Sequence, residues 1–319
     1  MHAAWPVTAD DLKAAHCWFG ADRVPGQPEV TEFKRRARWH QAQWRVGNGL
    51  PIGSHRRQGV TYENGSKIAY DPDHPPTDNF LSADILAMVR HRLANPERHQ
   101  TLQVERLWAD LLSSMPMCFN LFGEAAADPT RLAAAVDVLW PDHPGTATSL
   151  TFEWSPGRRE ESFLNNATAF DAAIHLDLDD GTKGIIGIET KYHEHIKAEA
   201  APNVEKRMPR YQAVTEASGV FVPGWETAIV GTDLQQIWLD HLLVLAMLQQ
   251  EPEQWSWGRF VLVHPAANPS VPAAAARYRE LLADDATFEV RTIEDLLAPS
   301  TLHEPPTETA FRARYLWPA

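Results

Sequence analysis

The second half of the chain alternates between two kinds of apolar pattern. The short runs "TSLTFEW" (148–154), "RFVLVHP" (259–265) and "TFEVRT" (287–292) have the length and composition of strands. The segments between them carry apolar residues every three to four positions, which indicates amphipathic helices. Strands that alternate with helices favour a mixed sheet. We therefore predict an α/β fold with helices flanking a mixed β-sheet and additional helices at the N-terminus.

The helical segments carry start and stop signals. Residues 80–114 break at Asn95-Pro96, because proline disfavours the helical conformation at the residue before it. Residues 129–140 begin with proline, which is tolerated in a first helical turn, and residues 232–250 begin at a Thr232 or Asp233 cap. The other expected helices span 8–20, 203–214, 273–282 and 293–297, and a proline-rich tail follows them.

A hairpin is predicted at 170–192, "FDAAIHLDLDDGTKGIIGIETKY", and its turn is compatible with two registers. With a two-residue turn at "DG", Asp171 and Glu189 fall on opposite faces of the ribbon. With a three-residue loop whose glycine is left-handed, Leu178 pairs with Thr182 and Asp171 lies opposite Glu189. The turn therefore decides whether the two acids meet.

The apolar residues choose between the two turns. The two-residue turn mixes Ile185 into the apolar face and leaves Glu189 there, whereas the three-residue loop keeps the apolar side chains together. The loop also places Lys191 on the face of the two acids and sets Asp177 opposite Lys183 as an attractive pair. We therefore predict the three-residue loop, whose apolar face gathers Ala172, Ile174, Leu176, Leu178, Ile186 and Ile188.

Two opposed carboxylates have a chemical consequence. Directly opposed residues have β-carbons about 4.5–5.5 Å apart, so Asp171 and Glu189 repel each other unless a proton or a cation lies between them. Mg²⁺ is commonly held by one or two carboxylates together with waters and substrate phosphate. With Lys191 on the same face to stabilise charge on phosphate oxygens, the three residues suit metal-assisted phosphodiester hydrolysis.

Two other interpretations of these charges remain open. They can be incidental charges at a solvent-facing sheet edge, although Glu189 and Lys191 follow the apolar run "GIIGI", where desolvated charges need partners. Asp171 and Glu189 can also serve as an acid and base pair in a hydrolase that needs no metal.

Composition narrows the class of protein. Of the 319 residues, 44% are hydrophobic and 22% charged, as in ordinary globular proteins, and no apolar run approaches the roughly 18–20 residues that cross a bilayer. Cys17 and Cys118 match no metal spacing and are expected to be reduced thiols. We therefore expect a soluble, cytoplasmic protein without a membrane partner. The net charge of −13 means that an anionic partner must be met locally.

The charge changes sign near the N-terminus. Residues 31–60 hold seven Lys and Arg against one acid, with Trp39 and Trp44 interleaved. Two interpretations stay open here, a solvated helix face above two core tryptophans or a phosphate-contacting arm. On the second interpretation the candidate nucleic-acid contacts are Lys34, Arg35, Arg38 and Arg45.

The hairpin with Asp171, followed by "IETKY" with Glu189 and Lys191, resembles the PD-(D/E)XK nuclease superfamily, whose members have the restriction-endonuclease-like fold. The proline that often precedes the first acid is replaced by Phe170, a departure that the superfamily tolerates. Further segments, which span most of the chain, are similar to a bacterial family of restriction-type endonucleases: "RWHQAQWRVGNGLPIG", "LLSSMPMCFNLFG", "FEWSPGR", "AFDAAIHL", "IETKYHE" and "LQQIWLDHLLVLAM".

This resemblance implies a role for each site residue. Asp171 and Glu189 would bind Mg²⁺, or Mn²⁺, together with the backbone carbonyl of Thr190, and Lys191 would be the catalytic lysine. A further acid often comes from a preceding element, and there Glu105 and Glu153 are rivals. A helix after the core often supplies a glutamine or a similar group, for which the candidates are Gln235, Gln236, Asp240 and His241. Nucleic-acid contacts are also expected from Gln235 and Arg158.

These patterns together predict a divalent-metal-dependent nuclease that hydrolyses DNA, of the restriction or defence type. We expect residues 1–79 to form a helical, basic arm packed on a nuclease-like domain at 80–319. The resemblance allows a homodimer, because cutting both strands usually takes two active sites. The alternative is a protein that keeps the nuclease fold and binds nucleic acid without turnover.

Overall fold

The computed structural model describes residues 5–100, 102–250 and 254–317, and a mixed five-stranded sheet lies at the centre of this part of the chain. The strand order is β3 (Gly145–Trp154), β4 (Phe170–Leu178), β5 (Lys183–Thr190), β6 (Trp255–His264) and β7 (Phe288–Thr292). Antiparallel pairing joins β3, β4 and β5, while β6 and β7 run parallel to β5. The predicted α/β fold with a mixed sheet is confirmed.

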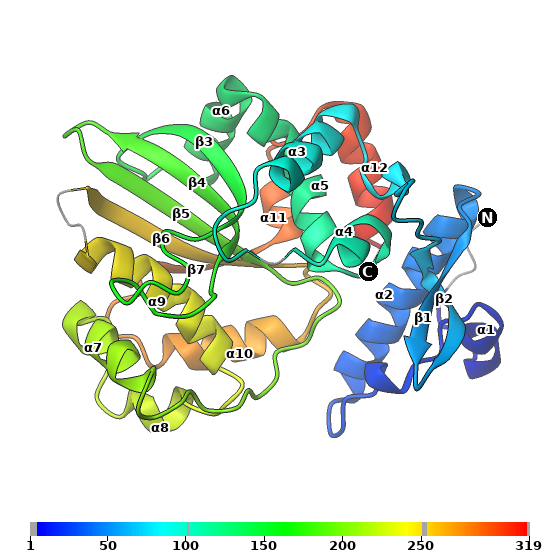
Figure 1. Cartoon of the computed structure of the whole chain (residues 1–319), viewed down its shortest axis with the longest axis horizontal. Helices are drawn as coiled ribbons and strands as arrows, with labels where there is room; N and C mark the ends of the chain where they lie inside the picture. The colour runs from blue at the N-terminus through cyan, green and yellow to red at the C-terminus, as the bar shows by residue number, and fades with distance from the viewer. Residues whose placement is uncertain (1–4, 101, 251–253, 318–319) are drawn as a thin grey trace.

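Helices cover both faces of this sheet (Figure 1). On the first face, the hydrophobic core is formed with side chains from one set of helices: α3 (Ala83–Ala94), α5 (Ser114–Ala127), α6 (Pro129–Leu139), α11 (Ile293–Leu297) and α12 (Pro305–Tyr315). A second set forms the core on the other face: α7 (Met208–Ser218), α8 (Trp225–Ile229), α9 (Gln235–Gln250) and α10 (Ser270–Arg279). Among the described residues, no helix is long and apolar enough to cross a membrane.

The hairpin between β4 and β5 has the predicted three-residue loop. Leu178 donates its N–H to the Thr182 carbonyl at 3.0 Å, and Gly181, with a φ of +85°, donates to the Leu178 carbonyl. The β4–β5 register places Ala172 opposite Ile188, so the next position sets Asp171 opposite Glu189. The predicted register is therefore confirmed.

The two faces of the hairpin are both buried for most of their length. The predicted apolar face, with Ile174 and Ile186, belongs to the first core, as expected. The face that carries the charges is not a solvent-facing edge, because Ala173 and Ile185 on it belong to the second core. Charged residues occupy only the two ends of this face.

Several elements of the described chain were not predicted. They include α5, α8, α12 and a hairpin of β1 (Ile52–Arg57) and β2 (Val60–Ile68), which forms a separate two-stranded sheet. The tail was misread because Pro305 and Pro306 lie in the first turn of α12, where proline lacks only an N–H that would be unpaired anyway. The remaining short helices are α1 (Ala9–Ala14), η1 (Gly20–Asp22), η2 (Thr77–Asn79) and α4 (Val104–Ala109).

The N-terminal elements are joined to the core through α2 (Pro28–Gly47), which lies beside α12 (Figure 1). The buried stripe of α2 is polar, with Lys34, Arg38, Gln41 and Arg45 at helical spacing and each less than 9% exposed. Gln41 Nε2 donates to the Tyr192 hydroxyl at 2.8 Å and also to a backbone carbonyl of α12. Hydrogen bonds thus take the place of apolar contacts along this stripe.

Gly187 of β5 lies against the ring of Phe170. A Cβ added at Gly187 would come closer than 3.0 Å to three ring carbons, so the ring or the strand would have to shift. We predict that Gly187→Ala lowers the free energy of unfolding by about 1–3 kcal/mol, the usual penalty for overpacking a core, as measured by urea titration. Gly20→Ala is the control, because its added carbon would meet no atom within 4 Å. Equal stability of the two variants would contradict this packing.

Candidate active site

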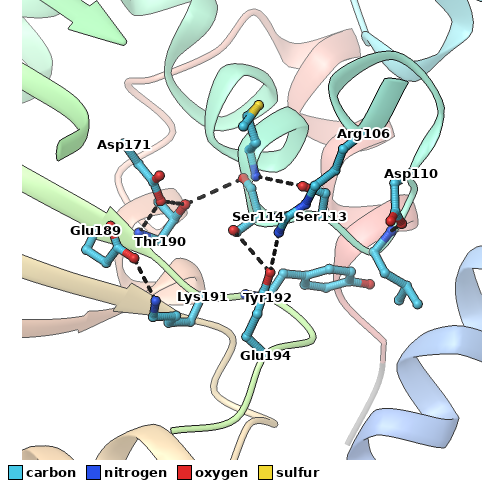
Figure 2. A network of polar contacts seen from close by, with 12 residues as sticks. Arg106, Asp110, Ser113, Ser114, Asp171, Glu189, Thr190, Lys191, Tyr192 and Glu194 are labelled. Atoms are coloured by element: carbon cyan, nitrogen blue, oxygen red, sulfur yellow. Dashed lines mark hydrogen bonds and ion pairs between the residues drawn. The ribbon is translucent and has the colours of Figure 1, made fainter. Parts of the chain in front are cut away.

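Three acids lie side by side at one end of the sheet. Residue pairs on either side of Glu153 in the β3–β4 register place Glu153 across from Asp171, and the β4–β5 register places Asp171 opposite Glu189. Lys191 follows directly after β5. Figure 2 shows Asp171, Glu189 and Lys191 gathered around the end of β5. The structure therefore brings together the acids and the lysine that the sequence singled out.

Neighbouring donors orient one oxygen of each central carboxylate. Asp171 Oδ2 accepts hydrogen bonds from the backbone N–H (2.8 Å) and the hydroxyl (2.6 Å) of Thr190. Glu189 Oε1 accepts hydrogen bonds from Lys191 Nζ (2.6 Å) and from Gln236 Nε2 of α9 (3.1 Å). Within the described chain, Asp171 Oδ1 and Glu189 Oε2 receive no hydrogen bond. One oxygen of each acid is thus left for another ligand.

The pKa values of the three acids are raised. Burial raises the pKa of Asp171 to about 7, and the Glu189 carboxylate adds to this effect. Burial and then the charge of Asp171 raise the pKa of Glu153 to about 8. The pKa of Glu189 is raised by burial against the opposing effect of Lys191. The protein's own cations therefore compensate this negative charge only in part.

Lys191 is 8% exposed and stays cationic. Burial disfavours its ammonium form, but the carboxylates of Glu189 and Asp240 outweigh burial and raise the pKa of Lys191 above its ordinary value. At neutral pH its Nζ is accordingly a hydrogen-bond donor and a positive charge rather than a base.

The backbone at Glu153 is held in an unusual conformation. Its φ is +50°, which is uncommon for a residue with a side chain. Its carbonyl accepts hydrogen bonds from Arg92 Nη2 (3.0 Å), Gln100 Nε2 (3.3 Å) and Arg158 Nη2 (2.5 Å). Such conformations persist where the surroundings over-determine them, as these three donors do, and they concentrate at functional sites. Arg158 is thereby engaged inside the protein, which argues against its predicted contact with nucleic acid.

Glu105, the rival of Glu153, faces elsewhere. Its side chain is 57% exposed and its carboxylate pairs with Lys67 Nζ at 3.1 Å. Glu153 instead lies close enough to Asp171 for their charges to interact. The structure thus places Glu153, and not Glu105, beside the pair of acids, while the metal-binding role of either residue stays a prediction.

The two adjacent glutamines of α9 have different environments. Gln235, the predicted nucleic-acid contact, is 3% exposed and its amide bonds to the Gly231 N–H and the Ala200 carbonyl. Gln236 points to Glu189, and Asp240, one helical turn later, has a pKa raised by burial and by Glu189. Helix phase therefore assigns the site to Gln236 and argues against the predicted role of Gln235.

The predicted basic arm points mostly inward. Arg38 bonds to both carboxylate oxygens of Asp22 and to the hydroxyl of Ser66. Arg45 donates to two backbone carbonyls, and Lys34 Nζ lies 3.3 Å from His195 Nδ1. These contacts argue against phosphate binding by Lys34, Arg38 and Arg45, because their donors are already engaged and buried. Arg35 differs, since it is partly exposed and its guanidinium lies 4.4 Å from the centre of the Trp18 ring.

Glu194 is a residue that the sequence analysis missed. Its carboxylate accepts hydrogen bonds from the Tyr192 N–H (3.0 Å), Arg106 Nη2 (2.9 Å) and Ser114 Oγ (3.3 Å), and so ties the segment after β5 to α4 and α5 (Figure 2). Although burial opposes it, Arg106 lowers the pKa of Glu194. Its partners come from separate elements, so no local pattern could have revealed it.

The comparison with protein families identifies the superfamily of this chain. A family model described as the PD-(D/E)XK nuclease superfamily matches residues 28–317, nearly the whole chain. The chain belongs to this superfamily. A search of curated proteins finds no match, and a search of solved structures finds none either. The predicted membership and the restriction-endonuclease-like fold class are confirmed. The match supports a nuclease, and PD-(D/E)XK nucleases generally use divalent metal ions.

The donor set of this PD-(D/E)XK protein fits a divalent ion. Carboxylate oxygens are the ligands that Mg²⁺ and Mn²⁺ prefer, and Asp171 and Glu189 each keep one oxygen without a hydrogen bond from the described residues. In that part of the chain, no three His, Cys, Asp or Glu side chains are grouped so as to hold a metal by themselves. An ion at this site would therefore complete its shell with water and phosphate oxygens.

The raised pKa of Asp171 predicts how stability varies with pH. The ordinary aspartate pKa is 3.8 and that of Asp171 is about 7, so between these values the folded protein binds more protons and its stability falls as pH rises. In EDTA we expect Asp171→Asn to raise the free energy of unfolding at pH 8 by roughly 1–4 kcal/mol, and by less at pH 5, in urea titrations. Mg²⁺ should stabilise the parent more than the variant at pH 8.

The control for this prediction is Asp179→Asn in the exposed loop of the same hairpin. Because its side chain is exposed, this substitution should change the free energy of unfolding by less than about 0.5 kcal/mol. A gain from Asp171→Asn that is equally large at both pH values would show that the charge of Asp171 carries no penalty in the folded protein.

Proposed function

We propose that this chain is a divalent-metal-dependent deoxyribonuclease of the restriction or defence type, with Mg²⁺ as its ion. The observation that carries the proposal is the opposition of Asp171 and Glu189 across the β4–β5 hairpin, with Lys191 bound to Glu189 at 2.6 Å. Membership of the nuclease superfamily supports it. A homodimer is part of the proposal for the cutting of both strands.

The two central acids would hold the ion. Asp171 and Glu189 would bind it through the oxygens that receive no hydrogen bond, with Glu153 beside them and the Thr190 carbonyl as a further ligand. When bound, such an ion polarises the scissile phosphate and activates a water. Thr190 and Gln236 hold the two carboxylates in place, which reduces the reorganisation needed on binding.

Lys191 supplies fixed positive charge. Because its pKa is raised, we assign its Nζ to donating a hydrogen bond to a phosphate oxygen as negative charge develops there, and not to removing a proton from water. The segment that carries Lys191 is fixed on its far side by Glu194, which bonds to the Tyr192 N–H and to Arg106. The lysine is therefore positioned before substrate binds.

Substitution of Lys191 tests this function. With plasmid and linear DNA in Mg²⁺, we expect Lys191→Ala to reduce the cleavage rate by about 10²- to 10³-fold, the usual effect of removing one donor to a developing charge. Lys183→Ala is the matched control, because Lys183 lies at the opposite end of β5 from Lys191 and pairs with Asp177 of β4 at 2.6 Å. It should retain full activity, and EDTA should abolish cleavage.

The outcomes of this experiment separate the competing functions. Cleavage that survives EDTA would favour a metal-independent acid and base pair. DNA binding without cleavage by the parent, with Lys191→Ala indistinguishable from it, would favour the inert nuclease fold that binds nucleic acid.

The third acid can be identified by a pair of substitutions. We expect Glu153→Gln to weaken Mn²⁺ binding by about 10- to 100-fold in calorimetric titrations and to slow cleavage, because Glu153 lies across from Asp171. Glu105→Gln should change neither quantity, since Glu105 pairs with Lys67. The opposite pattern would assign the third acid to α4.

A further inference from the structure

The outer half of the β1–β2 hairpin is an exposed ribbon that combines basic and apolar side chains. Arg57 pairs with Val60 across the two-residue turn Gln58-Gly59, whose φ values of +49° and +83° are those of a type I′ turn. Both strands are exposed next to this turn, and Val60 and Tyr62 are 51% and 49% exposed. A ribbon of two strands gains little stability alone, so exposed apolar side chains on it indicate a binding surface.

A cavity beside the outer half of this ribbon is lined by aromatic rings. Its volume is about 420 Å³, and its walls include Trp18, His55, Arg57 and Tyr62. Trp18 is 42% exposed, and His55 stacks on Tyr62 with ring centroids 5.6 Å apart. Exposed aromatic rings of this kind are platforms on which unpaired bases stack, at a sequence-independent gain in affinity.

Two residues of the aromatic cavity extend its lining toward the segment directly after β5. Phe19 and His55 also line a second cavity of about 310 Å³, whose other walls include His193 and Glu194 of the segment directly after β5. The rings of Phe19 and His55 lie 5.1 Å apart, and the guanidinium of Arg38 lies 4.2 Å from the ring centre of Phe19. A strand bound along the two cavities would therefore extend from the ribbon to the segment that carries Lys191.

Basic side chains lie around the outer cavity of this groove, while the wall of the second cavity also holds Asp110 and Glu194. The pKa of His55 is lowered by burial and then by three surrounding cations, Lys67, Arg38 and Arg57. The acid in the cavity wall, Glu63, pairs with His16 Nε2 at 3.0 Å. Arg57, exposed beside the rings of this cavity, complements a phosphate joined to an unstacked base.

We propose that the groove formed by Trp18 and the β1–β2 ribbon binds an unpaired stretch of nucleic acid next to the cleavage site, with bases on Trp18 and Tyr62 and phosphate at Arg57. That this stretch belongs to the substrate rests on the proposed function. Bases inside a duplex have both faces covered by their neighbours, so the rings select single-stranded or flapped nucleic acid over a blunt duplex. Arg35 supports the Trp18 ring from α2.

Binding measured without turnover tests this inference. In fluorescence anisotropy titrations of the full chain in EDTA, we expect a labelled single strand to bind more tightly than its blunt duplex. Tyr62→Ala and Trp18→Ala should each weaken single-strand binding by roughly 5- to 150-fold, the effect of losing one stacked base, and Tyr62→Phe should retain it. Val138→Ala, an exposed apolar residue of α6, is the control and should bind like the parent.

The salt dependence separates stacking from charge. Arg57→Ala should reduce the slope of log affinity against log salt by about 0.7, the value for one phosphate contact on a single strand. The two aromatic variants should leave that slope unchanged, as should Arg90→Ala, an exposed arginine of α3.

Two results would overturn the inference. One is equal affinity for the single strand and the blunt duplex, and the other is unchanged binding by Tyr62→Ala and Trp18→Ala variants whose circular dichroism and melting match those of the parent. Cleavage that depends on Lys191 without any effect of the aromatic variants on binding would leave the proposed nuclease intact and remove this groove. Binding that depends on the aromatic residues, without any cleavage, would support this groove and remove the proposed nuclease activity.

Discussion

Repulsion among Glu153, Asp171 and Glu189 is the constraint on which the candidate site depends. Each carboxylate in a partly buried space is costly unless donors or cations meet it, and here hydrogen-bond donors meet two of the three. Thr190 bonds to Asp171, and Lys191 and Gln236 bond to Glu189. At Glu153 the donors hold the backbone instead. Folding thus places these charges together in advance, so that they do not have to be brought together when a ligand binds.

The segment after β5 shows that the N-terminal elements take part in this assembly. Asp22 lies 3.0 Å from His193, Gln41 donates to the Tyr192 hydroxyl, and Lys34 lies beside His195. The polar stripe of α2 therefore fixes the chain just beyond Lys191, while Glu194 fixes it from the side of α4 and α5. A residue of the basic N-terminal segment, such as Lys34, can thus help to position the segment after β5 in the folded protein.

The limits of sequence reasoning follow from the same contacts. The hairpin register was predictable, because a slip by one residue moves every side chain to the opposite face and visibly mixes isoleucines with acids. The inward direction of the basic segment was not predictable, because charge counts carry no direction and Arg38 and Arg45 are buried with hydrogen-bond partners that lie far apart in sequence. Gln235 and Gln236 are adjacent on α9 and face different directions, and the sequence alone does not show which of the two faces the site. The strained backbone at Glu153 depends on three donors from separate segments.

The confirmed turn also sets how this hairpin can vary in length. Asp171 precedes Leu178 by seven residues, and Glu189 follows Thr182 by seven. The exposed loop can lengthen as long as Leu178 and Thr182 remain paired, because the ladder below them is unchanged. Within the strands, however, a deletion in β4 keeps the acids opposed only if β5 loses a residue as well. The lengths of β4 and β5 must therefore change together if Asp171 and Glu189 are to stay opposed, although the two strands are separate stretches of sequence.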